Sequence, residues 1–206
     1  IKEMFAGFKE NFTNIKLRVS LLFTIVVNIA MLGFNATIIY YLQDQLKLSN
    51  SLVGIVYSIA GFGSLIAVTL LSTFLNKKDT FILMNISMAT IPLVIMVSGI
   101  VENWIFFGIC YSILSGLITI ASVSITTIQQ QESTEYNIGK ILSSSFVIAT
   151  IFAPFGGILA AYFNWLLNPR LSLVILGLLS SLLVILIKSY EKKLTKKRTA
   201  IFIKED

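Results

Sequence analysis

Six long segments without a charged side chain limit the possible folds of this sequence more strongly than any other feature. At about 1.5 Å per residue, such segments are long enough to cross a hydrocarbon layer of about 30 Å as helices. Their residues are apolar on nearly every face and do not alternate, which favours helices over the strands of a membrane barrel. The predicted spans are residues 19–42, 52–75, 81–101, 104–128, 141–163 and 171–187.

The composition agrees with this interpretation. The chain has 206 residues, of which 56% are hydrophobic and 13% charged, and its mean hydropathy is +0.87. A soluble domain normally carries about 25% charged residues to cover its surface. The deficit predicts an all-α membrane protein whose partner is the lipid bilayer.

Lysine and arginine are distributed unequally between the two sides of the predicted bundle. Fourteen lie on the side of both termini, and only Lys47 and Arg170 lie on the other. Because cytoplasmic segments carry the excess of positive charge, we expect a multi-pass protein of the inner (plasma) membrane with both termini in the cytoplasm. The same placement favours a topology signal over binding to nucleic acid.

The two ends of the chain lie outside the predicted spans. Apolar residues recur at helical spacing within residues 1–18, which predicts an amphipathic helix on the inner membrane surface or a simple extension of the first span. Residues 188–206 form a basic tail, interpreted as a solvated cytoplasmic anchor. Since the chain begins with Ile1 and lacks a signal peptide, we expect a fragment or a processed chain. The apolar residues of the first segment are Ile1, Phe5, Phe8, Phe12 and Ile15.

The first span carries a polar stripe in an otherwise apolar helix. Its four residues lie within about 80 degrees of one another at 3.6 residues per turn. Two asparagine amides would be costly in hydrocarbon, so this face should meet other helices or a water-filled cavity. Contact between helices and lining of a cavity both remain open. The stripe consists of Ser20, Thr24, Asn28 and Asn35.

Small residues form further stripes on the fourth and second spans. Such stripes permit close approach of helix backbones, or leave room for a solute. On the fourth span the stripe consists of Gly108, Ser112, Ser115, Thr119, Ser122 and Thr126. On the second it consists of Gly54, Ser58, Gly61, Gly63, Ala67 and Ser72, and Tyr57 is a further candidate for a cavity.

The fifth and sixth spans differ in character. Pro154, Gly156 and Gly157 interrupt the fifth, and they predict either a moving hinge or a static kink, because proline removes a backbone donor. The sixth is almost uniformly apolar and is predicted to face lipid.

The sequence offers little for catalysis or metal binding. Histidine is absent, Cys110 is the only cysteine, and no acidic or basic residue lies within a predicted span. Glu102, Glu132 and Glu135 have no base or metal partner nearby in the sequence. We therefore expect no enzyme, no cofactor and no metal site, and any carboxylate that couples transport to protons must lie outside this chain.

The order and spacing of these features resemble the carboxyl-terminal half of the major facilitator superfamily, especially its bacterial macrolide and enterobactin efflux branch. The segment from Gly54 to Leu75 with Asn76, Lys77 and Lys78 resembles the family's cytoplasmic loop motif, with Ser72 and Asn76 in place of its glycine and acid. Two further matches are Gln129 followed by Gly139 and Lys140, and Pro154 followed by Phe155, Gly156 and Gly157.

The resemblance implies helices seven to twelve of a transporter, built as two three-helix units of inverted topology. It also implies a missing amino-terminal six-helix half as a partner and a small-molecule substrate. We expect export of amphipathic, drug-like or macrolide-like molecules by alternating access. The residues most expected to line the cavity are Asn28, Asn35, Ser115 and Thr119. The alternative is a complete six-helix membrane protein with a structural or assembly role.

Overall fold

The computed structural model describes the backbone of residues 2–74 and 80–205, and the side chains of residues 7, 9–72 and 80–196. Six helices in it are long and apolar enough to cross a membrane, so the predicted all-α membrane protein is confirmed. The elements are α1 (Lys2–Thr13), α2 (Ile15–Tyr40), the π-helical turn η1 (Tyr41–Gln45), α3 (Asn50–Phe74), α4 (Thr80–Ile100), α5 (Trp104–Gln131), α6 (Ile138–Leu166) and α7 (Pro169–Glu205).

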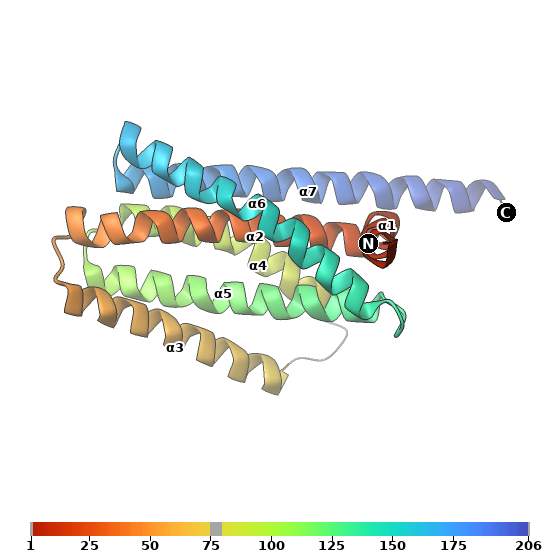
Figure 1. Ribbon diagram of the computed structural model, residues 1–206, viewed down its shortest axis with the longest axis horizontal. Helices are drawn as coiled ribbons and strands as arrows, with labels where there is room; N and C mark the ends of the chain where they lie inside the picture. The colour runs from red at the N-terminus through yellow and green to blue at the C-terminus, as the bar shows by residue number, and fades with distance from the viewer. Residues whose placement is uncertain (1, 75–79, 206) are drawn as a thin grey trace.

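The six long helices run up and down in one bundle, and α1 lies at the same end as the last turns of α7 (Figure 1). We call this the terminal end and the opposite one the distal end. An even number of crossings places both termini together. Several helices are longer than the spans predicted from the sequence. Helix α2 already begins at Ile15, and α7 continues to Glu205, through most of the segment that was interpreted as a basic tail.

The main contacts between helices come in matching pairs. The helices α2, α3 and α4 correspond to α5, α6 and α7 in that order. Under this correspondence, the contact of α3 with α5 matches that of α6 with α2, and the contact of α4 with α5 matches that of α7 with α2. The contacts of α4 with α7 and of α2 with α5 each join two corresponding helices, so the correspondence leaves them unchanged. Since α2 and α5 run in opposite directions, two inverted units of three helices would make these contacts.

Glycines repeat this relation at the points where the helices approach most closely. A Cβ atom on Gly63 of α3 would overlap the carbonyl oxygen of Ser112 on α5, and one on Gly156 of α6 would overlap that of Ile29 on α2. One helical turn further along α5 and α2, Cβ atoms on Gly116 and Gly33 would lie 3.1 Å from the carbonyl oxygens of Gly63 and Gly156 respectively. Both crossings therefore depend on backbone contact that only glycine permits.

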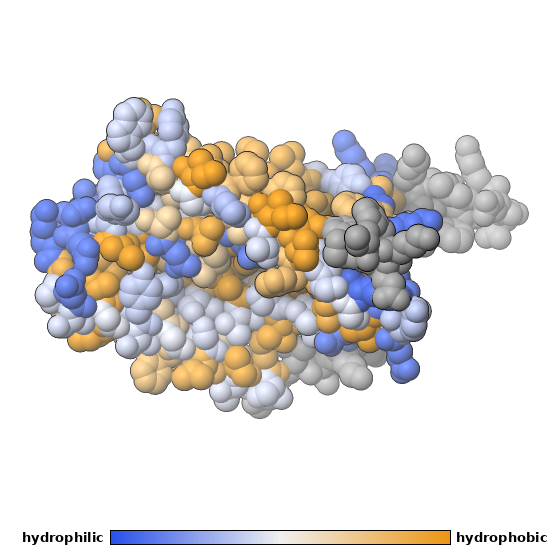
Figure 2. Space-filling model, viewed as in Figure 1, coloured by the Kyte–Doolittle hydropathy of each residue, from blue (hydrophilic) through white to orange (hydrophobic). Residues whose placement is uncertain are grey.

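The two broad faces of the bundle differ in polarity. Figure 1 looks onto α3, α5, α2 and α6 with α4 behind them, and pale and blue atoms lie among the orange ones on the same face in Figure 2. We call this the open face. The exposed large side chains of α4, by contrast, are all aliphatic, as expected for contact with lipid: Ile82, Ile86, Leu93, Val97 and Ile100.

Helix α1 packs against the beginning of α6. Asn11 is fully buried there; its amide donates to the hydroxyl of Ser144 at 2.8 Å and to the carbonyl of Ile141 at 3.2 Å, and it accepts from Ser145. A Cβ atom on Gly7 would overlap the backbone of Lys140. Of the predicted apolar stripe, Phe12 is exposed, while the side chains of Ile1, Phe5 and Phe8 lie outside the described residues.

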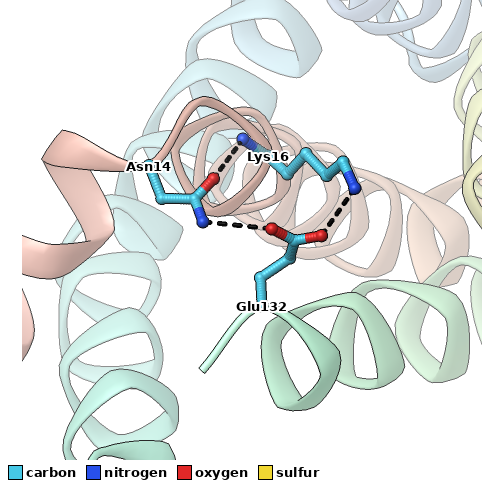
Figure 3. A network of polar contacts seen from close by, with 3 residues as sticks. All are labelled: Asn14, Lys16 and Glu132. Atoms are coloured by element: carbon cyan, nitrogen blue, oxygen red, sulfur yellow. Dashed lines mark hydrogen bonds and ion pairs between the residues drawn. The ribbon is translucent and has the colours of Figure 1, made fainter. Parts of the chain in front are cut away.

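A polar network ties the start of α2 to the end of α5 at the terminal end (Figure 3). The Lys16 Nζ atom lies 2.6 Å from Glu132 Oε1, and the Asn14 amide donates to Glu132 Oε2 at 3.1 Å. Burial raises the pKa of Glu132, but the hydrogen bonds from Lys16 and Asn14 and the charge of Lys16 outweigh it and hold the pKa below its usual value. The carboxylate therefore stays ionised at neutral pH.

Candidate functional site

A groove of about 350 Å³ opens where α2, α5 and α6 meet. Polar residues from all three helices lie among the aliphatic and aromatic side chains of its lining. A mixed lining of this kind is usual in small-molecule sites, where apolar surface supplies affinity and a few polar groups fix orientation. The lining consists of Thr24, Val27, Asn28, Ser122, Ile125, Thr126, Gln129, Leu142, Ser145 and Phe146.

The α2 side of the groove presents hydrogen-bond acceptors. Thr24 Oγ1 donates to the carbonyl of Ser20 at 2.8 Å, and Asn28 Nδ2 donates to the carbonyl of Thr24 at 2.9 Å. These bonds satisfy donors one turn back along the same helix. The carbonyl oxygen of the Asn28 side chain has no hydrogen bond to any described residue, and so it remains available to a ligand.

The α5 side presents hydroxyl groups. Most threonines in these spans donate to the carbonyl four residues earlier, as Thr119 does to Ser115 at 2.9 Å. Ser122 and Thr126 are exposed, and neither side chain makes a hydrogen bond within the described part of the chain. Two hydroxyls that can donate or accept therefore face the two α2 residues across the groove.

Gln129 completes the groove and was not predicted to lie in it. The sequence placed this residue in the connection after the fourth span, whereas the structure places it in the last turn of α5, with 4% of its surface exposed. Its Nε2 atom is buried and has no hydrogen-bond partner among the described residues. An unpaired buried amide costs about 1–3 kcal/mol of folding free energy.

Asn35 lies outside the groove in a cluster that links three helices. Its Oδ1 atom accepts from the hydroxyl of Tyr111 at 3.4 Å, and the ring of Tyr111 meets that of Tyr57 edge-on at 5.6 Å between centroids. Tyr57 is 37% exposed. Tyr111 was not among the predicted cavity residues, although its spacing from Gly108 places it on the face of the α5 stripe.

The remaining predicted cavity residues lie where helices pack. Ser112 meets Gly63 at the crossing of α3 and α5, and Ser115 Oγ lies 2.6 Å from Ser64 Oγ. Of the seven predicted cavity residues, Asn28 and Ser122 thus line the groove, and Asn35 and Tyr57 belong to the aromatic cluster. Ser112 and Ser115 lie in the packed crossing, and Thr119 bonds to the backbone beside it.

The predicted hinge and packing residues also divide. Gly63 and Gly156 form the two crossings, whereas Cβ atoms on Gly54 and Gly61 would meet nothing within 4 Å. Gly157 has room for a side chain, since its nearest neighbour would be Leu32 at 3.9 Å. Helix α6 continues through Pro154 without interruption.

Among the predicted loop residues, Lys140 lies with its Nζ atom 3.8 Å from the centroid of the Tyr136 ring, and a Cβ atom on Gly139 would meet nothing within 4 Å. Asn76, Lys77 and Lys78 lie outside the described residues. Among the described side chains, those of residues 7, 9–72 and 80–196, no group of three acidic, cysteine or histidine residues could hold a metal ion. No family model, curated protein or solved structure matches the chain.

Proposed function

We propose that the chain is one half of a secondary transporter that exports amphipathic small molecules by alternating access, with the groove as part of its binding surface. The observation that carries this proposal is the set of polar groups without a partner in the described residues, on Asn28, Ser122 and Gln129, in the mixed polar and apolar lining of the groove. Most buried polar groups in proteins have a hydrogen-bond partner, and the buried Gln129 Nε2 atom has none among the described residues.

The chemistry of the groove indicates the class of substrate. Val27, Ile125, Leu142 and Phe146 offer apolar surface, and the polar groups between them are amides and hydroxyls without fixed charge. Weak, uncharged hydrogen bonding beside a large apolar area suits loosely selective binding of bulky compounds with a few polar groups.

The arrangement of the helices supports a rocking mechanism. Two inverted three-helix units are the usual architecture of transporters that expose a central site alternately to each side. We propose that the open face meets a second six-helix half, and that the lysine-rich terminal end lies in the cytoplasm, with the protein in the plasma membrane. The resemblance to the major facilitator superfamily motivates both statements.

Efflux by the complete protein tests this proposal. Replacing Asn28 or Asn35 by leucine removes a polar group at the groove or the neighbouring cluster, so cells should accumulate more of an amphipathic dye. Asn85→Leu is the matched control, because Asn85 is also an amide within a span, but its Nδ2 atom donates to Phe81 and the residue lines neither site. Accumulation unchanged by Asn28→Leu, at equal expression, would contradict transport through the groove and favour the structural role.

A further inference from the structure

A second hollow lies at the distal end of the bundle, away from the groove. It occupies about 610 Å³ between the end of α2 with η1 and the end of α6 with the connection to α7. We call it the distal hollow. Its lining consists of Ala36, Tyr40, Asp44, Gln45, Ala161, Asn164, Trp165, Leu167, Asn168 and Pro169.

Asn164 lines this hollow and has a side-chain carbonyl oxygen without a partner among the described residues. Thr37 donates its hydroxyl proton to the carbonyl of Gly33 at 3.1 Å, so its oxygen can only accept from Asn164, whose Nδ2 atom lies 3.3 Å away. This contact fixes the orientation of the amide. The Asn164 Oδ1 atom is buried and has no hydrogen bond among the described residues, so its capacity to accept a hydrogen bond is unused.

Asp44 adds a negative charge to the same lining. Its carboxylate has no ion pair or hydrogen bond within the part of the chain that the structure describes. The wider π turn of η1 holds it near Tyr40: Leu46 N donates to the carbonyl of Tyr41, five residues back, at 3.1 Å. Such turns are rare and occur frequently at functional sites. Asp44 and Asn164 thus both line the hollow, and each has an oxygen that can accept a hydrogen bond and has no partner among the described residues.

Aromatic side chains supply the rest of the recognition surface. Tyr40 and Trp165, one from each side of the hollow, are 55% and 80% exposed. Tyrosine and tryptophan also anchor helices at membrane surfaces, but that role does not explain the unpaired Asn164 oxygen. Arg170, next to the lining, is engaged by Glu102 at 2.7 Å, so its charge is compensated and does not oppose a cation.

We propose that the distal hollow binds a protonated organic amine. The ammonium N–H groups donate to Asp44 and to Asn164 Oδ1, and the apolar body of the ligand lies against Tyr40 and Trp165. This site does not depend on the proposed transport function, because it shares no residue with the groove.

Binding of 2-phenylethylamine to the complete protein in phosphatidylcholine nanodiscs tests the proposal by equilibrium dialysis, with empty nanodiscs measured in parallel. We expect saturable binding that Asp44→Asn and Asn164→Leu each weaken about tenfold or more, because each removes a contact to a charged donor. The trimethylammonium analogue should bind more weakly than the amine, because it keeps the charge and loses the N–H donors.

Glu102→Gln is the matched control. It removes one negative charge at the same end of the bundle from a residue that does not line the hollow. Because it also leaves Arg170 without its ion pair, it should weaken binding, but clearly less than Asp44→Asn, which removes a direct contact to the ammonium group. Asp44 is exposed, so Asp44→Asn should keep the melting temperature of the unmodified protein. Equal loss in Glu102→Gln and Asp44→Asn would overturn the proposal, as would binding that does not saturate or that Asp44→Asn leaves unchanged.

Discussion

The crossing of α3 with α5 and the crossing of α2 with α6 bring helix backbones together through matching glycines. Gly63 meets Ser112 in the first as Gly156 meets Ile29 in the second. Their surroundings differ. Beside the first crossing, the hollow of about 260 Å³ is lined mostly by aliphatic side chains, and Ser115 is satisfied by Ser64.

The crossing of α2 with α6 has polar hollows on both sides. Towards the terminal end lies the groove with Asn28 and Gln129, and towards the distal end lies the hollow with Asn164. Two of these three amides keep a buried atom without a partner. The backbone contact is thus repeated in both crossings, whereas in the described residues the buried amides without a partner lie beside the crossing of α2 with α6.

The largest effect should come from filling either crossing. Gly63→Val and Gly156→Val place side-chain atoms where a backbone carbonyl already lies, and each should destabilise the protein by about 3 kcal/mol. Thermal unfolding in detergent measures this effect.

Gly61→Val is the matched control, since a side chain at this position, two residues from Gly63, would meet open space. It should leave the melting temperature nearly unchanged. If Gly61→Val were as destabilising as Gly63→Val, the assignment of the two faces of α3 would be wrong.

These two glycines also show the limit of prediction from the sequence. Charge-free segments of sufficient length were enough to predict six spans, because lipid leaves few alternatives. In a helix that is apolar all round, however, no pattern distinguishes the side that packs at Gly63 from the side that stays open at Gly61.

The unpaired amides could not be predicted for a related reason. Whether Gln129 or Asn164 finds a partner depends on residues far away in the sequence, such as Thr37, which lies 127 positions from Asn164. The stripe on α5 was found from its spacing, but its division into a packed part at Ser112 and an open part at Ser122 follows from where α3 crosses it.

A smaller effect, of opposite sign, is expected in the groove. Gln129→Met removes a buried amide that has no partner, and it should raise the free energy of unfolding by about 1 kcal/mol while reducing efflux. Chemical denaturation and dye efflux measured on the same variant check both parts. A loss of stability would show that Gln129 is a structural residue.

A substitution in the packed crossing of α3 with α5 should lower the free energy of unfolding, and by a smaller amount. Ser115→Ala removes the hydrogen bond to Ser64 and should cost about 0.6 kcal/mol. Its efflux activity should stay near that of the unmodified protein, because Ser115 does not line the groove. A clear loss of efflux at unchanged stability would place a binding surface in this crossing as well.

The smallest effect is expected for the polar network of Asn14, Lys16 and Glu132 at the terminal end. Because the folded protein lowers the pKa of Glu132, this carboxylate adds stability above its unfolded pKa, and the contribution is lost as the pH falls through its folded pKa. Lys16 is largely exposed, so we expect less than about 0.5 kcal/mol. Melting temperatures should fall slightly less on acidification in Glu132→Gln than in the unmodified protein; an equal fall would exclude a role for this group.

The most direct test asks whether the open part of the α5 stripe faces water. In a Cys110→Ala background of the complete protein, Ser122→Cys and Ser112→Cys are treated with a membrane-impermeant maleimide applied to both sides of the membrane. The groove predicts rapid labelling at position 122 and slower labelling at position 112, which is less exposed and packs against Gly63. Labelling at position 112 alone, or at neither position, would contradict a water-accessible groove.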